Sequence, residues 1–132
     1  MTIEYLAGFF DGEGSIGIYW SNGSSDTRYK SGHKNGSWIR SVSVVNTYRP
    51  ILETFQSHFG GRIGQIIKDP KYKPCFQWQI GSKFGIKTCL DELKPHLIEK
   101  REQAKLMLLA CEGLMNEEDA AKQLKELKHA IA

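Results

Sequence analysis

Two acidic side chains at the end of a short apolar segment are the first candidates for chemistry in this sequence. Residues 3–11 have apolar side chains at helical spacing and predict a helix, which the glycines at 12 and 14 would end. Asp11 and Glu13 would then lie at the negative pole of the helix dipole, where a carboxylate costs a few tenths to about 1 kcal/mol. Carboxylates and the unpaired carbonyls of a helix end suit a divalent cation that prefers oxygen ligands. Solvated surface acids explain the spacing equally well.

Glycine inside the predicted helix is a second unusual feature. Gly8 and Gly12 are one turn apart with Ala7 beside them, so one stripe of the helix has almost no side chains. A helical glycine costs roughly 1 kcal/mol relative to alanine, and close approach of another backbone is the usual compensation. The stripe therefore predicts a helix–helix contact. The simpler interpretation is that Gly12 and Gly14 only end the helix, and that Gly8 faces another part of the same domain.

The elements that must position these residues predict an α+β domain. In chain order they are the helix over 3–11, a strand over 15–20, a polar loop over 21–37, a strand over 38–46, a helix over 47–59, strands over 62–68 and 75–80, a helix that follows Ser82 and is broken by Pro95, a helix over 97–111 and a last helix after Asn116. Thr47, Ser82 and Asn116 are the expected N-caps. The order predicts a four-stranded antiparallel sheet with helices on one face, in a single domain over residues 1–132.

Composition restricts the classes of partner. The chain is 40% hydrophobic and 25% charged with a net charge of +3, which is ordinary for a globular protein and only weak support for a nucleic-acid partner. The longest apolar run, residues 106–111, is too short for a membrane span, and no secretory signal opens the chain. Three widely spaced cysteines and scattered histidines predict reduced thiols and no zinc site. We expect an intracellular protein that is not secreted and has no membrane partner.

The segment Tyr5–Ile16, YLAGFFDGEGSI, resembles the signature of the LAGLIDADG homing endonucleases. Its glycines, its acids and the following Ser-Ile are all in register with that signature. The αββαββα order and residues 100–104, KREQA, are also similar to the family, and the resemblance covers about residues 3–112. The last helix, about 116–131, is outside it. The resemblance implies a sheet shaped as a DNA-binding saddle, and a site-specific double-strand DNA endonuclease that promotes the mobility of an intron or intein.

The resemblance also implies a metal site. Glu13 matches the acid that binds the catalytic Mg²⁺, and Gly12 matches the residue before it, which contributes a backbone carbonyl. Mn²⁺ or Ca²⁺ would substitute for binding. Asp11 would be structural.

Three further positions match residues that act on water or phosphate in the family. Lys100 corresponds to a lysine that faces the scissile phosphates, and Asn46 to a polar residue that orders the attacking water. Arg49 is a candidate for an arginine near the second helix, where the spacing varies. In such a site a metal ion would lower the pKa of bound water and stabilise the charge of an in-line phosphodiester displacement.

A single copy of the motif implies a homodimer. The two-fold contact would lie at Ala7, Gly8, Asp11 and Gly12, and the DNA target would be roughly palindromic. Base contacts would come from the sheet, because glutamine and arginine pair bidentately with adenine and guanine and a β-ribbon fits the major groove. The candidate DNA-binding residues are Tyr19, Arg28, Lys30, Lys34, Arg40, Ser41, Ser43, Arg62, Lys68, Gln77 and Gln79.

For each of these positions alone, an ordinary solvated residue is an equally good interpretation. Trp20, Trp38 and Tyr48 could stack on DNA, although packing in the core or the hairpin is the stronger expectation.

Two other functions remain open. One is a non-cleaving DNA- or RNA-binding protein on the same scaffold, such as a maturase or a regulator. The other is an interaction module that works through the C-terminal helices. The presence of both Glu13 and Lys100 favours the endonuclease, because a pure binder needs no carboxylate aimed at phosphates. No small-molecule substrate is expected.

Overall fold

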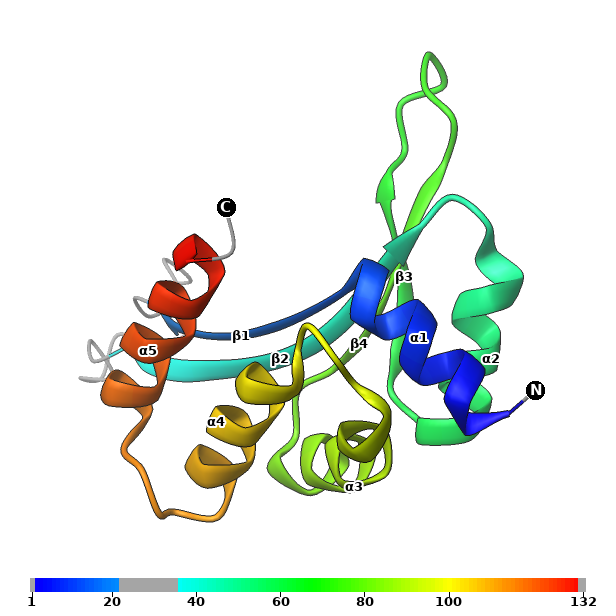
Figure 1. The fold of residues 1–132 in the computed structure, drawn as a ribbon. Helices are drawn as coiled ribbons and strands as arrows, with labels where there is room; N and C mark the ends of the chain where they lie inside the picture. The colour runs from blue at the N-terminus through cyan, green and yellow to red at the C-terminus, as the bar shows by residue number, and fades with distance from the viewer. Residues whose placement is uncertain (1, 22–35, 131–132) are drawn as a thin grey trace.

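A curved four-stranded antiparallel sheet with the strand order β1-β2-β4-β3 is the centre of the fold (Figure 1). The computed structural model describes residues 2–21 and 36–130. The elements in chain order are α1 (Ile3–Glu13), β1 (Gly14–Ser21), β2 (Ser37–Asn46), α2 (Arg49–Phe59), β3 (Arg62–Ile67), β4 (Cys75–Ile80), α3 (Lys83–Leu93), the 3-10 helix η2 (Lys94–His96), α4 (Arg101–Cys111) and α5 (Glu117–Ala130). The predicted α+β class and the αββαββα order with additional C-terminal helices are confirmed.

One face of the sheet carries the core. Alternate strand residues such as Ile16, Val42 and Trp78 point toward the helices and are completely buried. The indole Nε1–H of Trp78 donates to the carbonyl of Gly60 at 2.7 Å, so the largest core side chain also leaves no polar atom without a partner. The helices cover this face, and the opposite face is left open along its length (Figure 1). Within the described residues, no helix is both long and apolar enough to cross a membrane.

The first helix is longer than predicted. Gly12 and Glu13 are helical, and Gly14 is the C-cap. The expectation that Gly12 ends the helix was wrong, because glycine raises the cost of a helix but does not by itself terminate one. Gly14 has an ordinary extended backbone with φ −81°, and glycine is needed at this position for a steric reason. A Cβ there would lie 2.4 Å from Cδ1 of Phe10.

The second helix begins two residues later than predicted, and Thr47 is not its N-cap. The N-cap is Tyr48, which makes no side-chain capping bond. The Oδ1 atom of Asn46 instead accepts the backbone N–H of Tyr48 at 2.8 Å, which turns the chain at the end of β2.

The fourth helix begins at Arg101 and not at Leu97. The backbone N–H groups just before it are bound by a side chain from α1, described below, so they need no helical arrangement. The other two predicted caps are confirmed: Ser82 Oγ accepts the N–H of Gly85 at 3.1 Å, and Asn116 Oδ1 accepts the N–H of Asp119 at 2.8 Å.

Candidate active site and nucleic-acid interface

Helix α1 has one buried and one exposed face. Thr2 caps it by accepting the N–H of Tyr5 at 3.2 Å. Leu6, Ala7 and Phe10 are buried in the core of the same chain. The exposed residues are Glu4, Tyr5, Gly8, Gly12 and Glu13. The predicted metal ligand Glu13 therefore lies at the solvent-facing end of α1, whereas Ala7 has no free surface for a partner.

Gly8 and Gly12 are open toward solvent. A Cβ added at either position would meet no heavy atom within 4 Å, in contrast to the tightly packed Gly14. The interpretation in which Gly8 faces another part of its own domain is therefore wrong. Nothing in the described part of the fold requires a glycine at these two positions.

The carboxylate of Asp11 is bound by the start of α4. Its Oδ2 accepts the N–H groups of Ile98 and Glu99, each at 3.0 Å, and its Oδ1 accepts the N–H of Lys100 at 2.8 Å. Desolvation alone would raise the pKa of Asp11, but the three backbone hydrogen bonds and the charge of Lys100 outweigh it and hold the pKa below its ordinary value. Both carboxylate oxygens of Asp11 are thus engaged within their own chain.

The side chain of Lys100 turns back to the same helix end. Its Nζ donates to the backbone carbonyl of Asp11 at 2.5 Å. Lys100 and Glu13, which are far apart in sequence, are therefore brought to one end of α1. No direct contact joins their side chains within the described residues.

The groups at this helix end fit a hard divalent cation. Glu13 supplies an exposed carboxylate, and the last turn of a helix leaves carbonyls, here including that of Gly12, without an intrahelical partner. The carbonyl and the carboxylate of Asp11 are already in use. In the part of the chain that the structure describes, no three His, Cys, Asp or Glu side chains group together as metal ligands.

Asn46 at the end of β2 and Arg49 at the start of α2 have partners of their own. Asn46 lines a pocket with Tyr5 and Phe9, and its Oδ1 is bound to the N–H of Tyr48. Arg49 pairs with Glu53 at 3.3 Å and lies over the ring of Phe76. No contact among the described residues joins either side chain to Glu13 or Lys100.

The open face of the sheet carries polar side chains in register. Ser43 is opposite Gln79, and Gln79 is opposite Arg62. Gln79 Nε2 donates to Ser41 Oγ at 3.1 Å. The two serines are only 8% and 6% exposed, so their longer neighbours cover them. Tyr19 on β1 and Gln77 on β4 have the same alternation and complete this face.

Arg40 is not on the open face. It is opposite Ile18, on the side of the core, and its Nη1 pairs with Oε1 of Glu117 in α5 at 3.0 Å. Arg40 is therefore apart from the other candidate DNA-binding residues, because the strand alternation that aims Ser41 outward aims its neighbour inward.

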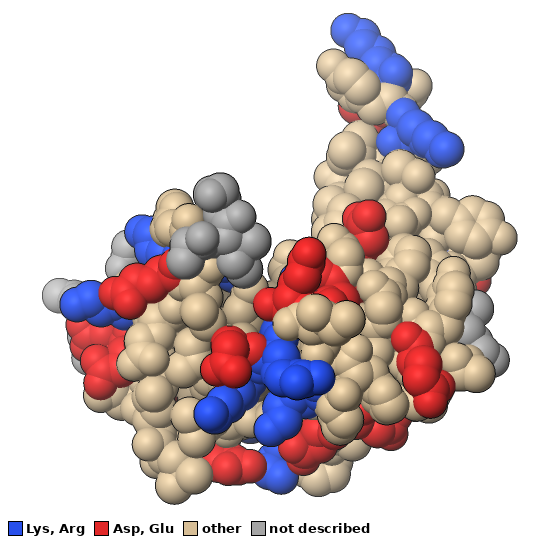
Figure 2. Space-filling model, in the orientation of Figure 1, with Lys and Arg blue, Asp and Glu red and all other residues tan. Residues whose placement is uncertain are grey.

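Lys68 follows β3 in the hairpin that projects above the sheet (Figure 1). Figure 2 shows basic side chains at the tip of this hairpin, whose connection also contains Lys71 and Lys73. Arg28, Lys30 and Lys34 lie outside the described residues.

The three aromatic residues proposed to stack on DNA, which are Trp20, Trp38 and Tyr48, have different surroundings. Trp20 and Trp38 pack edge to face across the β1–β2 pair at 5.2 Å, as expected for the hairpin. Tyr48 is 65% exposed and is therefore not a core residue.

Comparison with solved structures identifies the fold. Homing endonuclease I-CvuI, in complex with its target and in the presence of Ca, superposes with a TM-score of 0.74 at 23% identity, over 95% of this chain and 80% of that chain. The archaeal intron-encoded homing endonuclease I-Vdi141I, complexed with DNA, gives 0.65 at 20% identity, over 97% and 80%. Homing endonuclease I-TnaI gives 0.71 at 17%, over 99% and 96%. This chain has the LAGLIDADG homing-endonuclease fold. No family model and no curated protein matches it significantly.

Within the homing-endonuclease fold, α5 contributes a residue that sequence reasoning missed. Lys128 lines a pocket together with Gly14, Ser15, Glu99, Lys100 and Gln103. Burial, and in second place the charge of Lys100, lower the pKa of Lys128. The last helix is outside the segment that resembles the family, and its lysines were interpreted as a solvated face. No pattern in the sequence therefore distinguished Lys128 from the others.

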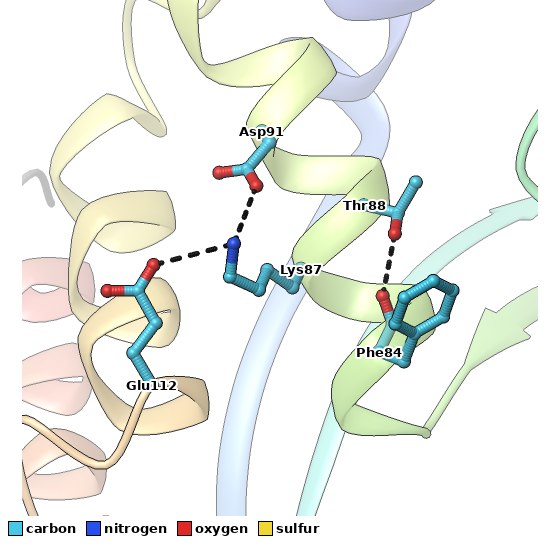
Figure 3. A network of polar contacts seen from close by, with 5 residues as sticks. All are labelled: Phe84, Lys87, Thr88, Asp91 and Glu112. Atoms are coloured by element: carbon cyan, nitrogen blue, oxygen red, sulfur yellow. Dashed lines mark hydrogen bonds and ion pairs between the residues drawn. The ribbon is translucent and has the colours of Figure 1, made fainter.

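A second polar cluster lies away from the open face. Figure 3 shows Lys87 of α3 between Asp91 and Glu112, with Nζ–carboxylate distances of 3.2 and 3.7 Å. The hydrogen bond that Lys87 donates to Asp91 is the largest contribution that raises the pKa of Lys87. Because these groups link α3 to α4 at the protein surface, they belong to the packing of the homing-endonuclease fold and not to the candidate site.

Proposed function

We propose that this chain is a site-specific double-strand DNA endonuclease that works as a homodimer, with Mg²⁺, on a long and roughly palindromic target. One observation carries the proposal. Glu13 presents an exposed carboxylate that has no structural partner in the described residues, at the helix end where Lys100 is held. A carboxylate beside an ammonium group is the combination that metal-dependent phosphodiester hydrolysis uses.

The exposed glycines support a two-fold seam. Gly8 and Gly12 face solvent, and a Cβ at either would have free space in the single chain. Their cost to the helix is offset if a second α1 packs directly on this stripe. We place the seam at Gly8 and Gly12, flanked by the half-exposed Tyr5, because Ala7 is buried in its own core. Asp11 lies beside the seam, with its carboxylate bound inside its own chain.

Such a seam would bring two copies of Glu13 together. Each copy would contribute its carboxylate and the carbonyl of Gly12 to Mg²⁺, with Mn²⁺ or Ca²⁺ able to replace it for binding. The bound cation would supply Lewis acidity that favours ionisation of water and stabilises negative charge on phosphate. Lys100 would add positive charge beside the phosphate. Asn46 and Arg49 would assist with water and phosphate only if DNA binding moves them, since their side chains now have other partners.

The open face of the sheet would contact the DNA. Gln77, Gln79 and Arg62 carry groups that pair with base edges, and β-strands fit the major groove. I-CvuI and I-Vdi141I are described as bound to DNA. I-Vdi141I is intron-encoded, and by analogy we propose that this chain promotes the mobility of an intron or intein.

A non-cleaving DNA- or RNA-binding protein is the second candidate, and one contact favours it. Lys100 already has a structural partner in the carbonyl of Asp11. A scaffold that had lost cleavage would keep this lysine to hold α1 against α4, so Lys100 alone does not distinguish the two functions. Glu13, which has no structural partner in the described residues, distinguishes them better.

Cleavage of a DNA library tests the proposal. The purified full chain is incubated with a randomised palindromic duplex library and Mg²⁺, and the products are sequenced. We expect a small set of related, roughly two-fold symmetric sites, and no products when EDTA replaces Mg²⁺. Tight binding without any product would support the non-cleaving candidate, and a lack of binding would reject both.

A further inference from the structure

Helix α5 crosses the free edge of the sheet from one face to the other. Its first turn is on the core side, where Glu117 pairs with Arg40 at 3.0 Å. Its last turn reaches the open side: Nζ of Lys128 lies 3.9 Å from the position of a Cβ on Gly17, and Gly17 is opposite Ser41 of the open face. Figure 1 shows α5 passing the end of β1 and continuing above it. The helix therefore delivers one ammonium group to the face that would contact DNA.

The ammonium group of Lys128 enters a pocket that already contains Lys100. The pocket has a volume of about 320 Å³, and its lining includes Gly14 and Ser15, which directly follow Glu13. Two ammonium groups and one carboxylate, that of Glu99, line it. The two lysines outnumber the one glutamate, so the lining has a net positive charge. Like charges are brought together at a cost unless an anion compensates them.

Gln103 also lines the pocket and has a polar atom without a partner among the described residues. The residue is only 5% exposed, and its Oε1 has no hydrogen-bond partner among the described residues. A buried amide oxygen without a partner costs about 1–3 kcal/mol, so a ligand or an ordered water is expected there. An ammonium group drawn inward by an anion, or a water bound beside it, would satisfy this oxygen.

We infer that Lys128 and Lys100 bind one phosphate group of the DNA backbone in the pocket that Gln103 also lines, next to the helix end that carries Glu13. The inference rests on the proposed function. Lys128 would contribute a sequence-independent contact that fixes the position of the strand, since phosphate contacts position the duplex and carry no base information. The last helix would thus be part of the DNA-binding surface, although it lies outside the motif segment.

Salt dependence of binding measures this contact directly. The full chain and its variants are titrated with a fluorescent duplex of mixed sequence in Ca²⁺ buffer at several salt concentrations, and log K is plotted against log salt. Each lost phosphate contact reduces the slope by about 0.9, so Lys128→Met in a homodimer should reduce it by roughly 2. Lys128→Arg should restore most of the slope. Lys125→Met removes the same charge from a position on the same helix that does not line this pocket, and it should change the slope much less.

A double variant locates the phosphate. If Lys100 and Lys128 bind the same group, Lys100→Met and Lys128→Met should be non-additive in binding free energy. Lys128→Met should also unfold at the same or a higher temperature than the original chain, because it removes repulsion between two ammonium groups. Equal slopes for Lys128→Met and Lys125→Met would overturn the inference and leave the proposed function intact. Failure of the original chain to bind any duplex would overturn the proposed function, and the inference with it.

Discussion

The carboxylate of Asp11 accepts the backbone N–H of Lys100 at 2.8 Å, across 89 residues of sequence. At the end of its own helix this acid is unfavourably placed, but the same carboxylate lies at the start of α4, where the helix dipole favours negative charge. One side chain thus caps the segment that leads into a helix distant in sequence. The bond from Lys100 Nζ to the Asp11 carbonyl closes the link in the opposite direction. The position of Lys100 beside the Glu13 helix end depends on this exchange.

Removal of the Asp11 carboxylate should destabilise the fold. Asp11→Ala leaves three backbone N–H groups without their acceptor, and we expect a loss of about 1–3 kcal/mol in the free energy of unfolding. Urea denaturation measures it. Asp91→Ala is the matched control, because it removes an acid from an exposed helical pair with Lys87, for which about 0.5 kcal/mol or less is expected. Equal losses in the two variants would contradict a capping role.

The same carboxylate should make the fold sensitive to acid. The pKa of folded Asp11 lies below its ordinary value of 3.8, so its contribution is fully present above pH 3.8 and is lost as the pH falls through the folded pKa. The difference in unfolding free energy between the original chain and Asp11→Ala should therefore be constant from about pH 5 to about pH 7. It should shrink below pH 3.8. Urea midpoints measured along a pH series test this. A difference that grows on acidification would have the wrong sign.

Glu13→Gln should abolish cleavage and leave DNA binding almost unchanged. The amide has nearly the same shape but a weaker affinity for a divalent cation, and Glu13 has no structural partner among the described residues. Cleavage of the selected target in Mg²⁺, and binding of the same duplex in Ca²⁺, are measured side by side. Glu4→Gln, an exposed acid at the other end of α1, should cleave normally. Normal cleavage by Glu13→Gln would remove this residue from the metal site.

The sequence predicted the fold well because each element has a strong local signal. Alternating apolar residues defined β2 and β4, and side-chain caps defined the starts of α3 and α5 at Ser82 and Asn116. The errors occurred where a side chain other than the predicted cap decides the local structure, either a distant one or a near neighbour. The start of α4 depends on Asp11, and the start of α2 on the turn made by Asn46.

The candidate site was predictable only in part. The motif identified Glu13 and Lys100, and the structure adds the contact through Asp11 that brings them to one helix end. Helix α5 changes the expected surroundings of two basic residues: Arg40, predicted to lie on the DNA-binding face, is on the core side, and Lys128, predicted to be solvated, reaches the open face. This helix supplies Glu117 to pair with Arg40 on the core side, and carries Lys128 to the open side. The path of a terminal helix across a sheet edge depends on tertiary packing, and no local pattern in the sequence specifies it.

Substitution of Gly8 should separate stability of the single chain from association. A Cβ at Gly8 has free space in the chain, so Gly8→Ala should stabilise α1 by up to about 1 kcal/mol through helix propensity alone. At a seam between two copies the same methyl group would force the backbones apart, and Gly8→Leu would do so more strongly. Sedimentation velocity over a range of concentrations should show the tightest dimers for the original chain, weaker dimers for Gly8→Ala and the weakest for Gly8→Leu. Dimers of Gly8→Leu as tight as those of the original chain would place the seam elsewhere.

Arg40 should affect stability and not DNA binding, opposite to what the sequence suggested. Its side chain is 16% exposed on the core side and its pairing partner Glu117 is 24% exposed, so Arg40→Gln and Glu117→Gln should each destabilise the chain, with a coupling of about 1 kcal/mol in a double-mutant cycle. Arg62→Gln removes the same charge from the open face and should reduce affinity for the duplex, with a smaller salt slope. Unfolding and binding are measured on all variants. A loss of DNA affinity in Arg40→Gln that matched Arg62→Gln, without a loss of stability, would mean that Arg40 leaves Glu117 to bind DNA.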